Sequence, residues 1–332
     1  MVRLSVVLLA ALLCGSALMA GCSSGGDGAD SSHASGAPAG HRGDKRAPRA
    51  LRASEVGRLP APVQLPAVAP RPGGGVLVAG GLSAADSSVA SILAVREGRS
   101  QALGSLPTPL HDAAAATLGG ATYFFGGGGV SGSSAEIQRI TPGGRVTRAG
   151  QLPQAASDIE AAVVGDTAYV VAGYTGSTAL RTIVAYRRGS PPRAVARLPV
   201  PLRYAAVAAV GRRVLIAGGT SGTALSRAVL SFDPAQGTVR RIGTLPSPLT
   251  HAAGVGWRGA LYVIGGRRTL PGRQTERILR VDPDSGAVRP SGSLPRPLSD
   301  ASAVARRDSI TVIGGRGADG RAQAGVIALR AR

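Results

Sequence analysis

Two short motifs recur along most of this chain at a nearly constant interval, and this recurrence constrains the fold more than any other feature. A Leu-Pro pair starts at positions 59, 106, 152, 198, 245 and 294, an interval of 46 to 49 residues. About 20 residues after each pair, an apolar stretch ends in two small residues, at 80–81, 126–127, 172–173, 218–219, 265–266 and 314–315. A fixed period of this length indicates one supersecondary unit repeated six times, as in the blades of a β-propeller.

The composition favours short strands and tight turns within each repeat. The chain has 49 Gly and 23 Pro, which excludes a coiled coil, and its hydrophobic fraction of 44% excludes a largely disordered protein. The fourth repeat has room for four strands, and a turn at 233–237 joins the last two. We expect those strands at 204–210, 214–217, 228–232 and 239–242. Each repeat is therefore expected to form a four-stranded blade.

The last repeat is one strand short, which predicts how the ring closes. After Gly314 and Gly315 the sequence contains only one more strand, 325–330. Residues 51–59 precede the first Leu-Pro pair, where a fourth strand belongs. We expect this segment to complete the last blade, because closure removes the exposed edges of the sheets. The predicted fold over residues 51–332 is thus an all-β, six-bladed propeller closed by its N-terminal strand.

The glycine doublets at this period, with an Asp-Pro turn at Asp233 and Pro234, resemble Kelch repeats. The resemblance covers residues 51–332 and implies a Kelch-like, galactose oxidase-like propeller. Kelch blades usually carry a Tyr and a Trp in their later strands. Here the Tyr position holds Tyr186, Phe232 and Ile140, and the Trp position never holds Trp. The chain is therefore a divergent Kelch-like protein, and the resemblance implies no particular partner.

The N-terminal 50 residues have the features of a lipoprotein leader and linker. A basic start is followed by an apolar stretch, Leu4–Leu13, and then by small residues, the layout of a secretory signal peptide. The end, Leu18-Met19-Ala20-Gly21-Cys22, resembles the bacterial lipobox, which implies lipidation of Cys22. We expect residues 1–21 to be the signal peptide and 22–50 a flexible tether, rich in Ser, Gly and Ala. The alternative is an uncleaved membrane anchor, since Leu4–Ala20 approaches the length of a span.

The cysteines and the charge limit the chemistry. Cys14 and Cys22 are the only cysteines, so the repeats have no disulfide, Cys-ligated metal or Cys nucleophile. A total of 38 Lys and Arg against 18 Asp and Glu gives a net charge of +20, which attracts phosphate-rich polymers or anionic membranes. The arginines are scattered, with no basic run interleaved with aromatic residues, so nucleic acid is not an expected partner.

Alignment of the repeats on their glycine doublets identifies a candidate ligand site. The residues 14 positions before each doublet are Pro66, Asp112, Asp158, Tyr204, His251 and Asp300. We expect each to begin an innermost strand, so that the six side chains ring one mouth of the channel. Adjacent candidates are His111, Arg203 and Glu160. The loops after the doublets, such as 131–134 and 175–178, should open on the same face. The ring could hold a cation or hydrogen-bond a polyhydroxyl ligand, or it could cap strands and tie blades together.

Known catalytic patterns are absent from the repeats. Residues 51–332 contain no Gly-x-Ser-x-Gly, His-Glu-x-x-His or phosphate-binding loop. The copper site of galactose oxidase needs a Tyr–Cys crosslink, and no Cys lies in the repeats. The six-bladed sialic acid mutarotases have the same number of blades and use acids and Arg around the channel. Asp112, Asp158, Glu160, Asp300 and Arg203 could supply such groups, but no motif matches residue for residue.

These observations predict a binding protein rather than an enzyme. We expect a propeller anchored outside the cytoplasm by lipid on Cys22, which binds a protein or a cell-envelope polymer through the face that carries the polar ring. No cofactor and no metal site are assigned. One alternative is a sugar-modifying enzyme of the sialic acid mutarotase type. A second is a basic adhesin for anionic wall polymer.

Overall fold

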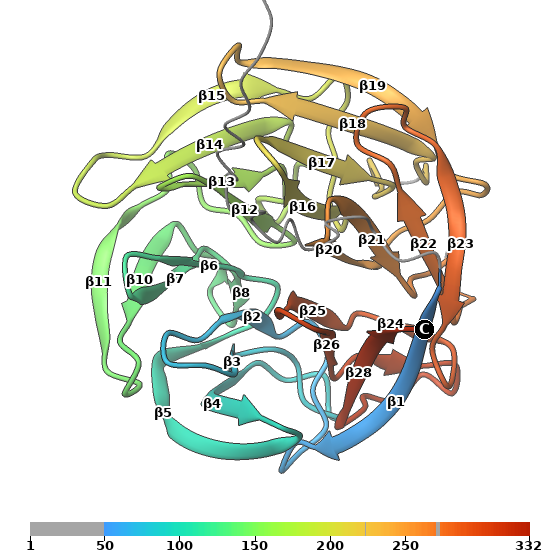
Figure 1. Ribbon diagram of the computed structural model, residues 1–332. Coiled ribbons are helices and arrows are strands. Elements are labelled where there is room, and N and C mark those ends of the chain that lie inside the picture. The colour runs from blue at the N-terminus through green and yellow to red at the C-terminus, as the bar shows by residue number, and fades with distance from the viewer. Residues whose placement is uncertain (1–49, 223, 270–272) are drawn as a thin grey trace, which may run out of the picture. The chain divides into compact units, whose positions relative to one another are not determined.

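The computed structural model describes residues 50–222, 224–269 and 273–332. In this range the chain forms six four-stranded antiparallel sheets around a central axis (Figure 1). The predicted all-β, six-bladed propeller is therefore confirmed. The predicted signal peptide, the lipidated Cys22 and nearly all of the predicted linker lie outside the described residues. None of the described residues belongs to a helix long and apolar enough to cross a membrane.

In the first five blades the strands follow chain order from the axis outward. Blade 1 contains β2 (Ala67–Pro70), β3 (Val76–Ala79), β4 (Val89–Arg96) and β5 (Arg99–Leu110). Blade 2 contains β6 (Ala114–Leu118), β7 (Ala121–Phe125), β10 (Glu136–Ile140) and β11 (Val146–Gln151). Blade 3 contains β12 (Glu160–Val164), β13 (Thr167–Val171), β14 (Thr182–Arg187) and β15 (Arg193–Arg197). The four-strand repeat read from the sequence is thus present in each of these blades.

The remaining strands complete the ring. Blade 4 contains β16 (Ala206–Val210), β17 (Arg213–Ala217), β18 (Ala228–Asp233) and β19 (Thr238–Thr244). Blade 5 contains β20 (Ala253–Trp257), β21 (Ala260–Ile264), β22 (Arg277–Val281) and β23 (Val288–Ser293). Blade 6 contains β25 (Ser302–Ala305), β26 (Ile310–Ile313), β28 (Gly325–Ala331) and β1 (Leu51–Arg58). Two short pairs lie in loops: β8 (Gly128–Gly129) with β9 (Gly132–Ser133), and β24 (Leu298–Ser299) with β27 (Arg316–Gly317).

The N-terminal strand closes the last blade, as predicted. β1 pairs antiparallel with β28, with Leu51 opposite Ala331 and Arg58 opposite Gly325. Figure 1 shows the blue β1 beside the red β28 at the outer edge of blade 6. Because this pairing joins the two ends of the chain, it removes the open sheet edges that an unclosed ring would expose.

The hydrophobic core is divided among the gaps between neighbouring blades. The buried apolar residues form six clusters, and each cluster draws on two adjacent blades. Small residues such as Ala114 and Ala116 occupy the innermost strands, where neighbouring blades converge, and larger residues such as Phe124 fill the wider space outside them. Every blade therefore depends on both of its neighbours. The propeller lies within one compact unit, residues 44–332, that contains all of its own core.

The second glycine of each doublet packs against the segment that enters the innermost strand of its own blade. Gly266 has a φ of +103°, and a Cβ at this position would lie 2.8 Å from Ala252 Cβ and 2.9 Å from the Thr250 carbonyl oxygen. Its N–H donates to the Leu298 carbonyl of the next blade at 2.8 Å. A side chain here would meet backbone atoms as well as a strained φ, so only glycine fits without displacement.

The two ends of the axis have different structures. The connections between blades and the loops after the glycine doublets meet at one end, which we call the mouth face. The hairpins that join first to second strands, and third to fourth strands, meet at the other end, which we call the hairpin face. There the Arg71 guanidinium donates to the Pro142 carbonyl at 2.9 Å, which links a first–second hairpin of blade 1 to a third–fourth hairpin of blade 2.

Candidate binding site at the channel mouth

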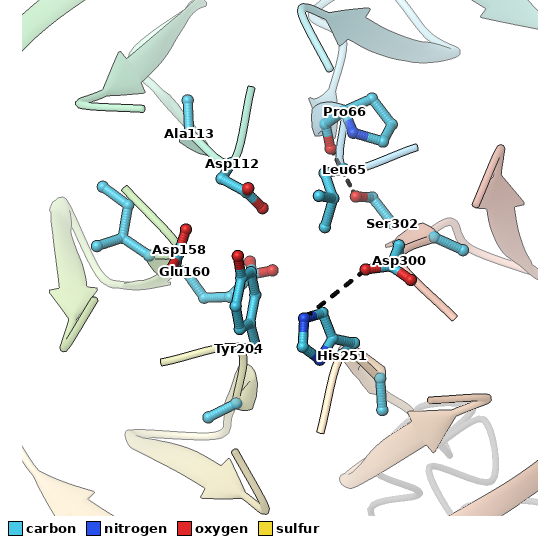
Figure 2. A pocket seen from close by; sticks show the side chains of 14 residues that line it. Leu65, Pro66, Asp112, Ala113, Asp158, Glu160, Tyr204, His251, Asp300 and Ser302 are labelled. Atoms are coloured by element: carbon cyan, nitrogen blue, oxygen red, sulfur yellow. Dashed lines mark hydrogen bonds and ion pairs between the residues drawn. The ribbon is translucent and has the colours of Figure 1, made fainter. Parts of the chain in front are cut away.

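Six equivalent residues, one per blade, encircle the channel at the mouth face. All adopt the left-handed conformation, with φ between 52° and 58°, and they are Leu65, Asp112, Asp158, Tyr204, His251 and Asp300. We call them the mouth ring. Asp and His are enriched among the non-glycine residues that adopt this conformation, so the backbone explains part of the residue choice. Figure 2 shows their side chains converging on the axis.

Backbone hydrogen bonds join consecutive members of the mouth ring. The His251 N–H donates to the Tyr204 carbonyl at 3.1 Å, the Asp300 N–H to the His251 carbonyl at 3.0 Å, and the Leu65 N–H to the Asp300 carbonyl at 2.7 Å. The Asp112 N–H continues the series to the Leu65 carbonyl at 3.3 Å. The main chain of the mouth ring thus links neighbouring blades through these hydrogen bonds.

The position expected in blade 1 was wrong by one residue. Alignment on the glycine doublets selects Pro66, but Leu65 has the left-handed φ and the ring hydrogen bonds. The cause is the hairpin between β2 and β3, which spans residues 71–75 and is longer than its counterparts in the other blades. The other five members lie just before their innermost strands rather than at the first residue of each. Pro66 still lines the mouth.

Two members of the mouth ring are paired with arginines. Arg203 Nη2 lies 2.5 Å from Asp158 Oδ2 and donates to the Tyr204 hydroxyl at 3.0 Å, while its guanidinium stacks 4.0 Å from the Tyr174 ring centroid. Burial raises the pKa of Asp158, and Arg203 offsets part of this rise.

The second ion pair joins Arg267 to Asp300. Ser299 also donates its hydroxyl to the Asp300 carboxylate, whose side chain is completely buried. One Arg–Asp pair therefore joins blade 3 to blade 4 and the other joins blade 5 to blade 6.

Two further carboxyl groups at the mouth have no such partner. The Asp112 side chain is only 6% exposed, yet within the described residues no hydrogen bond reaches its carboxylate; His111 Nε2 lies 3.9 Å away. Burial, followed by repulsion from Asp158 and Asp300, raises the pKa of Asp112 well above its usual value. Below it, burial raises the pKa of Glu160 to about 8. The Glu160 side chain borders the hollow of the channel, so it has accessible surface although protein surrounds it.

His251 is held as a neutral ring. It stacks on Tyr204 with ring centroids 3.8 Å apart and an interplanar angle of 23°. Burial, with repulsion from Arg267 and Arg203, lowers the pKa of His251 to about 2. The 3.9 Å contact between His251 Nε2 and Asp300 Oδ1, dashed in Figure 2, is therefore not an ion pair at neutral pH. The buried His251 Nδ1 has no hydrogen-bond partner within the described chain.

The space enclosed by these side chains is small. The cavity at the mouth has a volume of about 40 Å³ and is lined by the mouth ring together with Glu160 and Ser302. A second cavity of about 60 Å³ follows deeper in the channel, with Glu160 again in its wall. Sites for whole small molecules are typically ~300–1,000 Å³, whereas a few water molecules or one small functional group fit here. Among the described residues no group of three or more His, Cys, Asp or Glu is arranged to hold a metal, so the idea of a bound cation gains no support.

The sequence identified most residues of this site but not Arg267, the ion-pair partner of Asp300. His111, Arg203 and Glu160, expected beside the ring, all lie at the mouth or in the channel. The loops after the doublets open on the same face, as expected, because Tyr174 forms a β-bridge with Ser157 and Gly128 with His111. Arg267 was not among the candidate residues. It is the first residue after its doublet, so counting one position beyond the glycines would have found it.

Comparison with known proteins agrees with this architecture. No protein-family model and no curated protein matches the sequence. Among solved structures, the chain is similar to one described as the structure of YjhT, with a TM-score of 0.70 and 16% sequence identity. The match covers 82% of this chain and 96% of the other. At this identity the likeness concerns the fold alone, and it supports the six-bladed, Kelch-like propeller.

Proposed function

We propose that this protein is a binding module that receives a small polar group of a larger partner, a protein or a cell-envelope polymer, at the channel mouth. The observation that supports it is the Asp112 carboxyl in the wall of the cavity: its side chain is 6% exposed and receives no hydrogen bond from the described residues. A ligand group that donates to this carboxyl would add a hydrogen bond that the described chain does not supply. The two Arg–Asp pairs and the Tyr204–His251 stack hold the surrounding wall in place.

The size of the cavity favours a partner over a free small molecule. A volume of about 40 Å³ admits a hydroxyl, an amide or an amino group, while the rest of the ligand would lie on the mouth face. Such a group can reach both Asp112 and Glu160, which act as hydrogen-bond donors when protonated and as acceptors when ionised. We further propose that lipidation of Cys22 anchors this module outside the cytoplasm.

A thermal-shift screen of residues 44–332 tests the binding proposal. The panel is sugar acids, polyols and envelope-polymer fragments, applied to the wild type, Asp112→Asn and Asp308→Asn. Asp308 lies on the hairpin face with its side chain 81% exposed, so its substitution makes the same charge change away from the site. A ligand at ~100 times its Kd should raise the melting temperature by about 5 °C. We expect a shift in the wild type and in Asp308→Asn that is lost in Asp112→Asn; a shift that Asp112→Asn retains would exclude the mouth.

A sugar-modifying enzyme of the sialic acid mutarotase type is the second candidate. It is favoured by the raised pKa values of Asp112 and Glu160, because a carboxyl group that keeps its proton near neutral pH can act as a general acid. NMR of a sugar acid would detect accelerated exchange between its anomers. Exchange that is lost in both Asp112→Asn and Glu160→Gln would favour catalysis, and binding without exchange would favour the module.

A further inference from the structure

The hairpin face, at the opposite end of the axis from the mouth, is a continuous surface built from parts of every blade. Asp166 in a first–second hairpin pairs with Arg187, the last residue of β14, which leads into a third–fourth hairpin. Arg213 likewise donates to the Pro283 carbonyl of the next blade at 2.9 Å. These contacts, with that of Arg71 to Pro142, show that both kinds of hairpin lie at one level around the axis.

This surface carries an excess of positive charge. Its acids are largely neutralised locally, since Asp166, Asp284 and Asp308 each lie within ion-pair distance of an Arg on the same face. Arginines without an ion pair among the described residues remain in the hairpins of several blades, and they include Arg71, Arg145, Arg188, Arg212, Arg306 and Arg307. At the mouth face, by contrast, Arg203 and Arg267 pair with buried Asp residues. The mouth face also carries exposed arginines, among them Arg181, Arg268 and Arg321, and the hairpin face has two acids without an ion pair in the described chain, Asp233 and Asp282. The unpaired arginines of the hairpin face still outnumber its unpaired acids, so this face has a net positive charge.

Both ends of the propeller chain lie at this same face. β28 pairs with β26 so that Leu329 is opposite Ile310, the first residue after the last first–second hairpin. β1 begins opposite the end of β28, and the Arg332 N–H donates to the Ala50 carbonyl at 3.1 Å. Arg52, Arg330 and Arg332 add further positive charge there and line one surface hollow. Ala50, the first described residue, therefore lies at the hairpin face, and Cys22 precedes it in the sequence.

We propose that the hairpin face docks on the anionic phospholipid headgroups of the membrane, so that the polar mouth points away from the lipid. Basic surface residues are attracted to anionic lipid, and one anchoring signal combined with a basic patch gives stable membrane attachment. The charge of the face and the entry point of the chain indicate the same orientation. The inference concerns a surface distinct from the mouth and holds whatever the mouth binds.

Vesicle sedimentation tests whether the charge of the hairpin face binds lipid. It uses residues 44–332, which lack Cys22. We expect binding to phosphatidylcholine vesicles that contain phosphatidylglycerol, little binding to phosphatidylcholine alone, and release at high salt. Each Arg near an anionic surface contributes roughly fivefold in affinity. The triple substitution Arg188→Glu, Arg212→Glu and Arg307→Glu should therefore weaken binding by at least about 100-fold.

A matched variant distinguishes binding through the hairpin face from binding that depends only on the net charge of the protein. Arg181, Arg268 and Arg321 are exposed in loops at the mouth face, and their substitution by Glu makes the same charge change. The mouth-face triple should stay within about threefold of the wild type, because those positions lie beyond a Debye length of docked lipid. An equal loss in both triples would overturn the proposal. So would absence of wild-type binding at low salt, or binding to soluble poly(glycerol phosphate) but not to the vesicles.

The fluorescence of Trp257 can show which face of the wild-type protein contacts the lipid. Trp257 is the only Trp in the chain; it ends β20 at the hairpin face and donates its indole N–H to the Arg306 carbonyl at 2.8 Å. Vesicles with a nitroxide on the lipid headgroup should quench Trp257 emission on binding. Bound protein without quenching would place the hairpin face away from the lipid and would contradict the proposal without any substitution.

Discussion

His251 lies flat against Tyr204, with ring centroids 3.8 Å apart, and its buried Nδ1 has no hydrogen-bond partner within the described chain. Burial of the ring, followed by repulsion from Arg267 and Arg203, favours the uncharged imidazole, and so the pKa of His251 falls to about 2. The mouth therefore contains a neutral His whose charge does not respond to physiological changes in pH.

The titration of the histidines tests this arrangement. Residues 44–332 contain two histidines, His111 and His251, and burial lowers the pKa of both, that of His251 much further. We expect NMR to show one imidazole that stays neutral down to pH 4 and one that titrates. Two histidines titrating together near pH 6.5 would contradict the buried stack.

The same depressed pKa predicts a loss of stability in acid. Below pH 6.5 the unfolded chain binds a proton at His251 that the folded protein does not, so the free energy of unfolding falls as the pH falls below this value. His251→Gln removes this contribution. Urea unfolding from pH 7 to pH 5 should show a smaller decline for His251→Gln than for the wild type, and equal declines would argue that His251 is accessible to protons.

Asp112→Asn should stabilise the protein at neutral and alkaline pH. A folded-state pKa raised well above that of the unfolded chain gives stability that is present at low pH and is lost as the pH rises through the folded value. Asn removes that loss and tolerates the φ of 52°. The check is urea unfolding at pH 8, with Asp308→Asn as the exposed control. A destabilised Asp112→Asn would mean that the carboxylate has an internal partner.

Glu160→Gln should change the pH dependence of stability between about pH 5 and pH 8. The pKa of Glu160 is raised from 4.5 to about 8, so the wild type should lose stability between about pH 5 and pH 8, as the unfolded chain ionises first. The Gln variant should show a flatter profile over this range. Identical profiles would indicate that water in the channel solvates Glu160 well enough to restore its ordinary pKa.

Leu51→Ala tests the closure of the ring. Leu51 is 1% exposed and packs in the cluster between blades 5 and 6, although it is the first residue of β1. Loss of a buried Leu side chain typically costs ~2–5 kcal/mol. Arg52→Ala, at the next and exposed position, should change stability by no more than ~0.5 kcal/mol. Thermal and urea unfolding would measure both, and a mild effect of Leu51→Ala would show that the propeller does not need β1.

Gly266→Ala and Gly176→Ala separate steric fit from backbone strain. Both glycines have similar φ values, +103° and +99°, but a Cβ at Gly176 would meet nothing within 4 Å. We expect Gly176→Ala to cost ~1 kcal/mol from the left-handed backbone alone. Gly266→Ala should cost ~1–3 kcal/mol more, because its Cβ overlaps Ala252 and the Thr250 carbonyl. Equal costs in urea unfolding would exclude close packing against the start of the innermost strand as the reason for glycine at this position.

The sequence by itself determined the number of blades, their four strands and the closure by residues 51–59. These follow from the repeat period and from the strand missing after Gly315. Both can be read from the order of residues along the chain. It also determined five of the six members of the mouth ring, because the repeats place their backbones in the same left-handed turn, and Asp and His adopt that turn more readily than most other residues.

Only the tertiary structure decided which of those residues face one another. Arg267 and Asp300 meet because adjacent blades converge at the axis, and Leu65 replaces Pro66 because one hairpin is longer than its equivalents. The unpaired state of Asp112, the depth of Glu160 and the small volume of the cavity also depend on contacts among different blades. A repeat period fixes positions within each blade, whereas burial and pairing at the axis arise from how six blades pack, and that packing sets the chemistry of the site.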